Sequence, residues 1–238
     1  MLQACLNGGR MPAEAPAVPI SPDRLAADAA AARAAGADCL HVHPRDRAGA
    51  ETLEPDEVAA ALSAIRDAVP GMAVGIGTGS WIAPGGVRRH AHMRGWRVRP
   101  DYVSVNLNEA DAPQVVGLMA GMGVAVEAGI WSRADAERFL AGIDPAACLR
   151  VLVEMPDAAP EEALAEADGV LSLLRDGGCT LPVLLHGLDR SAWPCLARAA
   201  ALGLDTRIGF EDVVTLPDGR PAPDNAALVS AARAILDA

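Results

Sequence analysis

The sequence predicts a single α/β domain with the TIM (β/α)8 barrel fold over residues 1–238. Short apolar runs typical of strands alternate eight times with longer amphipathic runs typical of helices. The chain length of 238 residues is close to the ~250 residues usual for this fold. No shift in composition marks a linker or a second domain. An open doubly wound sheet is the main alternative, but it usually has fewer strand–helix units.

Taken in order, the strand-like runs end at Gly, Pro, Asn or charged residues, which are typical of turns. They predict strands at residues 2–6, 37–43, 72–76, 102–105, 124–128, 149–154, 181–185 and 206–210. Ser21 followed by Pro22 predicts the cap and the first residue of the first helix. The helices are expected at residues 22–35, 54–68, 112–122, 133–141, 160–175, 191–202 and 225–236, with a poorly defined, arginine-rich helical stretch at 84–96.

The composition excludes several classes of protein. A net charge of −11 argues against a nucleic-acid-binding surface, which needs clustered basic residues. The five cysteines form no CxxC pair, which argues against a disulfide scaffold and a cysteine zinc knuckle. No apolar run reaches the ~18 residues of a membrane span, and the first residues lack the basic region of a signal peptide. We therefore expect a cytoplasmic protein with no nucleic-acid or membrane partner.

His41 and His43 are the most informative pair of residues in the chain. They lie two apart in a predicted strand, so their side chains project from the same face. Neutral imidazoles that share a face can bind zinc or a related transition metal. The alternative is that one histidine is a hydrogen-bonded core residue and the other a surface residue.

Polar side chains follow most of the predicted strands, and in a (β/α)8 barrel the functional groups lie at the C-terminal ends of the strands. These residues are Asn7, His41, His43, Thr78, Asn106, Glu127, Glu154, His186 and Glu211. The first, second and eighth strands are neighbours around a barrel, so Glu211 can reach the two histidines. A His2Glu set leaves one zinc coordination position open for substrate. Alternatively, Glu211 and Asp212 only begin a turn.

Several motifs resemble those of the β-keto acid cleavage enzyme family, typified by 3-keto-5-aminohexanoate cleavage enzyme. They are Asn7-Gly8-Gly9, the segment 16–22, His41-Val42-His43-Pro44-Arg45-Asp46, Gly77-Thr78-Gly79, Val126-Glu127 and Arg207-Ile208-Gly209-Phe210-Glu211-Asp212, with Asn225 beyond. They occur in the family's order along nearly the whole chain. The chain is thus identified as a short, divergent member.

The resemblance implies a zinc-dependent, homo-oligomeric enzyme, a dimer or tetramer. Its reaction condenses a β-keto acid with acetyl-CoA and releases acetoacetate and a new acyl-CoA. By position, the implied zinc ligands are His41, His43 and Glu211. Arg207 and Asp212 are the implied catalytic dyad that generates the substrate enolate. The implied substrate-binding positions are Asn7, Arg10, Thr78, Asn106 and Glu127.

Three features depart from the family pattern. The loop at residues 155–160 lacks the Gly-Gly-Met segment expected near the coenzyme A site. Gly77 stands where a serine is common. Arg10 stands where the lysine-fermentation enzyme has a glutamate facing its substrate's amino group, so an anionic or neutral substrate tail is predicted here.

Two other functions stay open at this point. A TIM barrel that binds zinc but does not use coenzyme A would be a metal-dependent lyase or hydrolase acting on a small carbonyl substrate. A barrel in which the histidines are incidental would be a binding or assembly module without catalytic activity.

Overall fold

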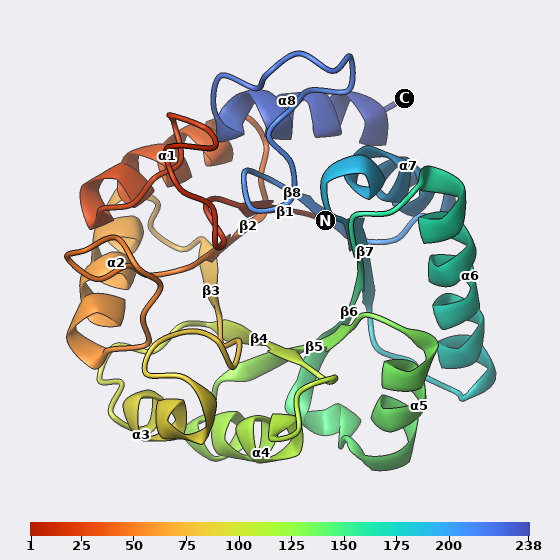
Figure 1. Ribbon diagram of the computed structural model, residues 1–238, viewed down its shortest axis with the longest axis horizontal. Helices are drawn as coiled ribbons and strands as arrows, with labels where there is room; N and C mark the ends of the chain where they lie inside the picture. The colour runs from red at the N-terminus through yellow and green to blue at the C-terminus, as the bar shows by residue number, and fades with distance from the viewer.

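The computed structural model, which describes residues 1–238, confirms the TIM (β/α)8 barrel (Figure 1). Eight parallel strands form one sheet in the order β7-β6-β5-β4-β3-β2-β1-β8. The strands are β1 (Leu2–Cys5), β2 (Cys39–Val42), β3 (Ala73–Gly77), β4 (Tyr102–Asn106), β5 (Ala125–Ile130), β6 (Cys148–Met155), β7 (Val183–Gly187) and β8 (Thr206–Ile208). The helices that surround them are α1 (Pro22–Ala34), α2 (Pro55–Ala68), α3 (Arg89–Arg94), α4 (Ala112–Met122), α5 (Arg133–Gly142), α6 (Pro160–Asp176), α7 (Ala192–Leu202) and α8 (Asn225–Leu236).

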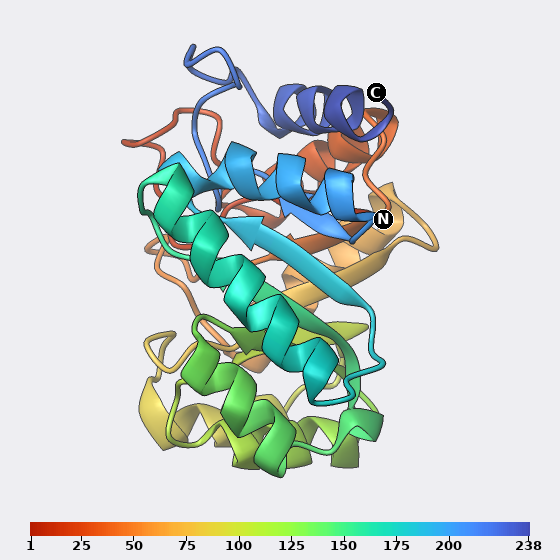
Figure 2. The same cartoon turned by 90° about the vertical axis from the view of Figure 1, so that its right-hand side faces the viewer.

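The barrel closes where β7 meets β8. The backbone N–H of Asp205 donates to the carbonyl of Val183 at 3.1 Å, and the N–H of Leu185 donates to Asp205 at 3.0 Å. The Thr206 hydroxyl adds a 2.8 Å hydrogen bond to the carbonyl of Leu185. Because all eight strands run in the same direction, their C-terminal ends share one rim of the barrel (Figure 2).

The helices bury one apolar stripe each against the strands. In α2 the buried residues include Val58, Leu62 and Ile65, whose spacing places them on one face of the helix. Each such side chain contributes about 1.5–3 kcal/mol when it is fully buried. The predicted start of α1 is confirmed, since the Ser21 side chain accepts a hydrogen bond from the N–H of Arg24. None of the helices is long and apolar enough to cross a membrane.

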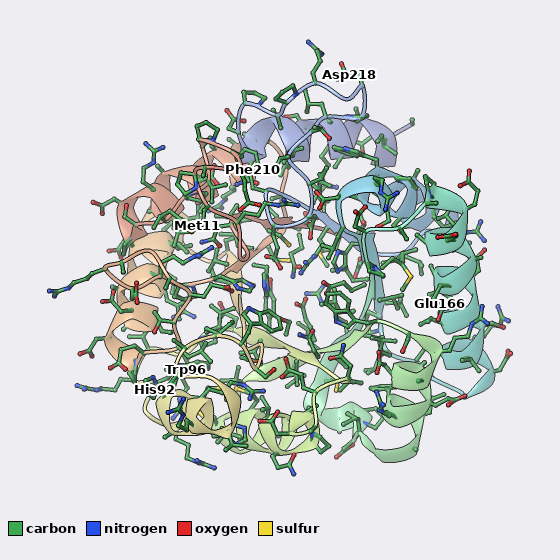
Figure 3. All side chains as sticks on the ribbon, viewed as in Figure 1. Met11, His92, Trp96, Glu166, Phe210 and Asp218 are labelled. Atoms are coloured by element: carbon green, nitrogen blue, oxygen red, sulfur yellow. The ribbon has the colours of Figure 1, made fainter.

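Side chains fill the ring of strands (Figure 3), and some of them are charged. Glu127 is fully buried, accepts one hydrogen bond from Gln3 at 2.9 Å and forms an ion pair with Arg150 at 3.0 Å. The predicted fifth strand ended at residue 128, but β5 continues to Ile130. Glu127 therefore lies within the barrel wall, three residues before the strand ends, and not at the rim.

The stretch predicted as a poorly defined helix at 84–96 contains only a short 3-10 turn and the six-residue helix α3. Gly85 and Gly86 have positive φ angles of 78° and 53°, which an α-helix does not contain. The helix therefore starts after them. His92 on α3 lies in the outer ring of helices (Figure 3) and pairs with Glu54 at 3.2 Å.

Candidate active site

His41, His43 and Glu211 come together at the C-terminal rim of the barrel. His41 belongs to β2 and His43 follows that strand directly, whereas Glu211 lies in the loop after β8. The two Nε2 atoms are 3.1 Å apart, and carboxylate oxygens of Glu211 lie 3.6 Å from His41 Nε2 and 3.7 Å from His43 Nε2. One potential ligand atom from each residue falls within a mutual distance of 4.8 Å. The three side chains thus converge on one point. The spacing of the histidines predicted their shared face, and the neighbourhood of the first, second and eighth strands predicted that Glu211 can reach them.

The protonation states of this cluster suit a cation. Burial lowers the pKa of His41 to about 3, so its imidazole is neutral at physiological pH. Burial raises the pKa of Glu211, but the charges of Arg207 and of the histidines outweigh that effect and hold its pKa well below the usual range. The Glu211 Oε2 atom is buried and has no hydrogen-bond donor. Two imidazoles, of which that of His41 is neutral, and one ionised carboxylate that converge in this way fit a zinc ion.

The loop after β1 fixes both sides of this cluster. The Asn7 side chain is buried and clamps the backbone of His43, accepting from its N–H at 2.8 Å and donating to its carbonyl at 2.9 Å. Gly8 follows with a φ of 51°, and a Cβ there would come within 2.3 Å of the Glu211 side chain. Asn7 therefore holds the His43 backbone, and Gly8 leaves room for Glu211.

Glu51 is a contact that the sequence analysis missed. Its Oε1 atom lies 2.5 Å from Nδ1 of His43. The residue lies in the loop between β2 and α2. Nothing in the sequence of this loop distinguishes an acidic residue that contacts the site from one that is exposed to solvent. Only the fold of this loop brings Glu51 to the ring of His43.

Arg207 and Asp212 form a buried pair beside Glu211. Both Nε and Nη2 of Arg207 donate to Asp212 Oδ1, at 3.1 and 2.8 Å, and Nη2 also donates to Glu211 at 3.0 Å. His186 lies 3.5 Å from Asp212 and 3.4 Å from Glu154. Burial and the Arg207 charge lower the pKa of His186, but the two carboxylates outweigh them and raise it. The Asp212 Oδ2 atom is buried without a donor.

A cavity of about 180 Å³ opens beside these groups. Its wall includes two of the three clustered residues, His43 and Glu211, together with Arg207 and Glu154. Asn106, a predicted substrate-binding residue, and the neighbouring Trp131 also line it. A larger cavity of about 520 Å³ lies between α4 and α5 and shares no residue with this one.

The other predicted substrate-binding residues do not line this cavity. The Thr78 hydroxyl donates to the carbonyl of Ser104 at 2.6 Å. The Arg10 guanidinium binds Asp189 at 2.5 Å and Glu14 at 3.2 Å. Asn7 and Glu127 contact other parts of the protein, as described above. Of the five predicted substrate-binding residues, Asn106 alone lines the cavity.

Comparison with known protein structures shows the same fold. ObcA in its apo form aligns with a TM-score of 0.73 and 17% identity, over 92% of this chain and 61% of that one. A ternary complex of ObcA with a C4-CoA adduct and oxalate gives a TM-score of 0.73 over 93% and 64% of the two chains. The chain thus spans less than two thirds of the ObcA chains. (S)-3-O-geranylgeranylglyceryl phosphate synthase from Thermoplasma acidophilum aligns over 100% of this chain with a TM-score of 0.58 and 16% identity.

Comparison with known sequences is more specific. A 3-oxoadipate:acetyl-CoA acetyltransferase from Cupriavidus necator is 28% identical over 242 residues, which cover 93% of this chain and 82% of that protein. The family profile described as beta-keto acid cleavage enzyme matches residues 1–238, the whole of the chain, including every residue of the clusters above. The chain belongs to the beta-keto acid cleavage enzyme family.

Proposed function

We propose that the protein is a zinc-dependent β-keto acid cleavage enzyme that condenses a β-keto acid with acetyl-CoA and releases acetoacetate and a new acyl-CoA. The observation that carries the proposal is the convergence of His41, His43 and Glu211 beside a cavity in a chain of this family. The name of the Cupriavidus relative supports both the β-keto acid and acetyl-CoA. A zinc ion in this cluster would act as a Lewis acid that polarises the keto group and stabilises negative charge on its oxygen.

The reaction needs one proton to leave the carbon between the keto group and the carboxylate. We propose that Asp212 Oδ2 removes this proton, because this oxygen is buried and accepts no hydrogen bond within the protein. Arg207 binds the other carboxylate oxygen and so keeps Asp212 oriented. The resulting carbon nucleophile forms a bond to the acetyl carbon of acetyl-CoA, and the thiolate leaves.

The second half of the reaction exchanges the acyl groups. The thiolate attacks the original keto carbon, and the bond from that carbon to the central carbon breaks. The central carbon takes the proton back from Asp212, which completes acetoacetate and leaves the new acyl-CoA. Proton transfer by a positioned side chain contributes typically 10²–10⁴-fold to such a rate.

A reaction that does not use coenzyme A is the second candidate, and the loop after β6 favours it. Only residues 156–159 separate β6 from α6, and Asp157 in this loop binds Arg190 at 2.8 Å. The loop lacks the Gly-Gly-Met segment that the family resemblance leads one to expect near the coenzyme. In this second candidate the same residues would serve a metal-dependent lyase or hydrolase.

The test is a reaction of zinc-loaded protein with acetyl-CoA and three groups of β-keto acids, whose tails are cationic, neutral or anionic. Mass spectrometry would follow acyl-CoA and acetoacetate. We expect a new acyl-CoA, and none with the His43→Ala variant. Consumption of keto acid without any acyl-CoA would select the second candidate. If Arg10 faces the tail, Arg10→Glu should weaken turnover of dicarboxylic keto acids, as the sequence predicted.

The cytoplasmic location and the homo-oligomeric state stay predictions. Light scattering of the purified protein would test the expectation of a dimer or tetramer. Whether zinc is the physiological metal would be tested by the metal content of protein purified without added metal.

A further inference from the structure

Nδ1 of His43, the ring nitrogen that faces away from the metal cluster, contacts the carboxylate of Glu51. This nitrogen lies 2.5 Å from Glu51 Oε1, and both the ring and the carboxylate are largely shielded from solvent, with side-chain exposures of 6% and 16%. The indole N–H of Trp81 lies 3.4 and 3.3 Å from the two oxygens of the same carboxylate. His43, Glu51 and Trp81 thus form a chain of contacts that leads outward from the candidate metal cluster.

Two glycines at the end of β3 make room for this chain. A Cβ on Gly77 would lie 2.3 Å from Nε2 of His43, and a Cβ on Gly79 would lie 2.4 Å from the ring of Trp81. With the two rings placed as they are in this chain, a side chain at either position would require the ring of His43 or of Trp81 to move. The placement of Glu51 between the rings therefore depends on the backbone of this loop and of β3.

The two histidines of the cluster differ in this respect. Nδ1 of His41 is buried and has no hydrogen-bond partner, whereas Nδ1 of His43 faces a carboxylate. A carboxylate beside Nδ1 places the single hydrogen of a neutral imidazole on that atom. Nε2 of His43, which faces Nε2 of His41 and Glu211, then carries a lone pair that can bind a cation shared by the three residues.

We propose that Glu51 is a positioning residue that fixes the tautomer of His43 and sets the metal affinity of the cluster, and that Trp81 orients Glu51. The inference rests on the metal centre of the proposed function, but not on the use of acetyl-CoA. Without Glu51, the hydrogen of His43 is free to move to Nε2, where it would have to be displaced before a metal could bind. Losing such a hydrogen-bond partner typically lowers metal affinity by about 10–100-fold.

The experiment compares zinc affinities of metal-free wild type, Glu51→Ala and Trp81→Phe, by competition with a chromophoric chelator. Glu137→Ala is the matched control, because Glu137 is an exposed acidic residue on α5. We expect the dissociation constant to rise about 10–100-fold for Glu51→Ala. A smaller rise is expected for Trp81→Phe and none for the control. The circular dichroism of each metal-free variant shows whether it is folded.

A nitrogen NMR spectrum of the histidine rings supplies a second readout, which a merely structural role would not move. In metal-free wild type, His43 should carry its hydrogen on Nδ1, and in Glu51→Ala it should shift toward Nε2. Unchanged zinc affinity and an unchanged tautomer in a folded Glu51→Ala variant would overturn the inference. If the Glu51→Ala variant does not fold, two other results decide the inference. An unchanged zinc affinity and an unchanged His43 tautomer in Trp81→Phe would overturn the role of Trp81, and a His43 ring that carries its hydrogen on Nε2 in the wild type would overturn the role of Glu51.

The outcome is separable from the acyl-transfer reaction. Wild type that binds no zinc would overturn both the inference and the metal-dependent function. Wild type that binds zinc tightly but makes no acyl-CoA would overturn the proposed reaction, and the comparison of variants would still decide the role of Glu51.

Discussion

Replacing Gly77 by alanine should disable the candidate metal cluster with a single added methyl group. The new Cβ would lie 2.3 Å from Nε2 and 2.4 Å from Cε1 of His43, whereas unbonded carbon atoms pack at about 3.5–4.0 Å. The ring cannot easily yield, because Asn7 clamps its backbone and Glu51 holds Nδ1. We therefore expect His43 to shift by about 1 Å, which is well beyond the ±0.2 Å tolerance of metal–ligand distances.

A misplacement of about 1 Å near a reacting group can lower activity about 10²-fold. We expect a loss of that order in kcat/KM for Gly77→Ala, together with a large loss of zinc affinity in the chelator competition. Gly117→Ala is the matched control, because a Cβ on this glycine of α4 would meet nothing within 4 Å. The control should keep full activity and gain about 0.5–1 kcal/mol of stability. A Gly77→Ala variant that keeps zinc affinity and activity within about twofold of wild type would refute the reasoning.

Two further predictions concern the carboxylates of Asp212 and Asp28. In D2O with zinc and no acetyl-CoA, Asp212→Asn should slow deuterium exchange at the central carbon of a β-keto acid at least about 100-fold, as followed by proton NMR. Glu154→Gln, which changes a carboxylate that lines the cavity, should slow this exchange less than about tenfold, and the reverse result would make Glu154 the base. Burial raises the pKa of Asp28 from 3.8 to about 6. Above pH 6 the ionised carboxylate lowers the stability of the folded protein, and below pH 3.8, where Asp28 is protonated in both the folded and the unfolded state, this loss of stability disappears. Asp28→Asn should therefore stabilise the protein by about 2 kcal/mol near pH 8 and by almost nothing near pH 4, and an equal gain in urea unfolding at both pH values would contradict this cause.

The barrel was predictable because its strand–helix alternation is written in local apolar patterns. The convergence of His41, His43 and Glu211 was predictable for a related reason. Residues two apart share a strand face, and the first, second and eighth strands of a barrel are neighbours. The sequence thus contained both pieces of information that place the cluster at one rim.

The depth of a side chain in the barrel was harder to predict. A shift of two residues in the end of β5 moved Glu127 from the rim to the interior, where it pairs with Arg150. Thr78 follows β3 as predicted, but its hydroxyl binds a backbone carbonyl instead of lining the cavity. Strand periodicity predicts which face of the sheet a residue lies on. It does not predict at which residue the strand ends, and so it does not predict how far a side chain lies from the rim of the barrel.

Loop contacts were not predictable at all. Glu51 reaches His43 only through the path of residues 44–54, and no periodic pattern governs that path. Gly77 stands where a serine is common in the family. Only the structure explains this glycine, because the ring of His43 occupies the space that a side chain would fill.

The most direct test of the proposed reaction uses acetyl-CoA labelled with ¹³C in both acetyl carbons. Zinc-loaded protein would react with the best β-keto acid of the panel, and mass spectrometry would locate the label. The proposed reaction predicts that all the label appears in acetoacetate, with an equal amount of unlabelled new acyl-CoA. Label that stays in acetyl-CoA or appears as free acetate while the keto acid is consumed would contradict acyl exchange and favour the metal-dependent lyase or hydrolase.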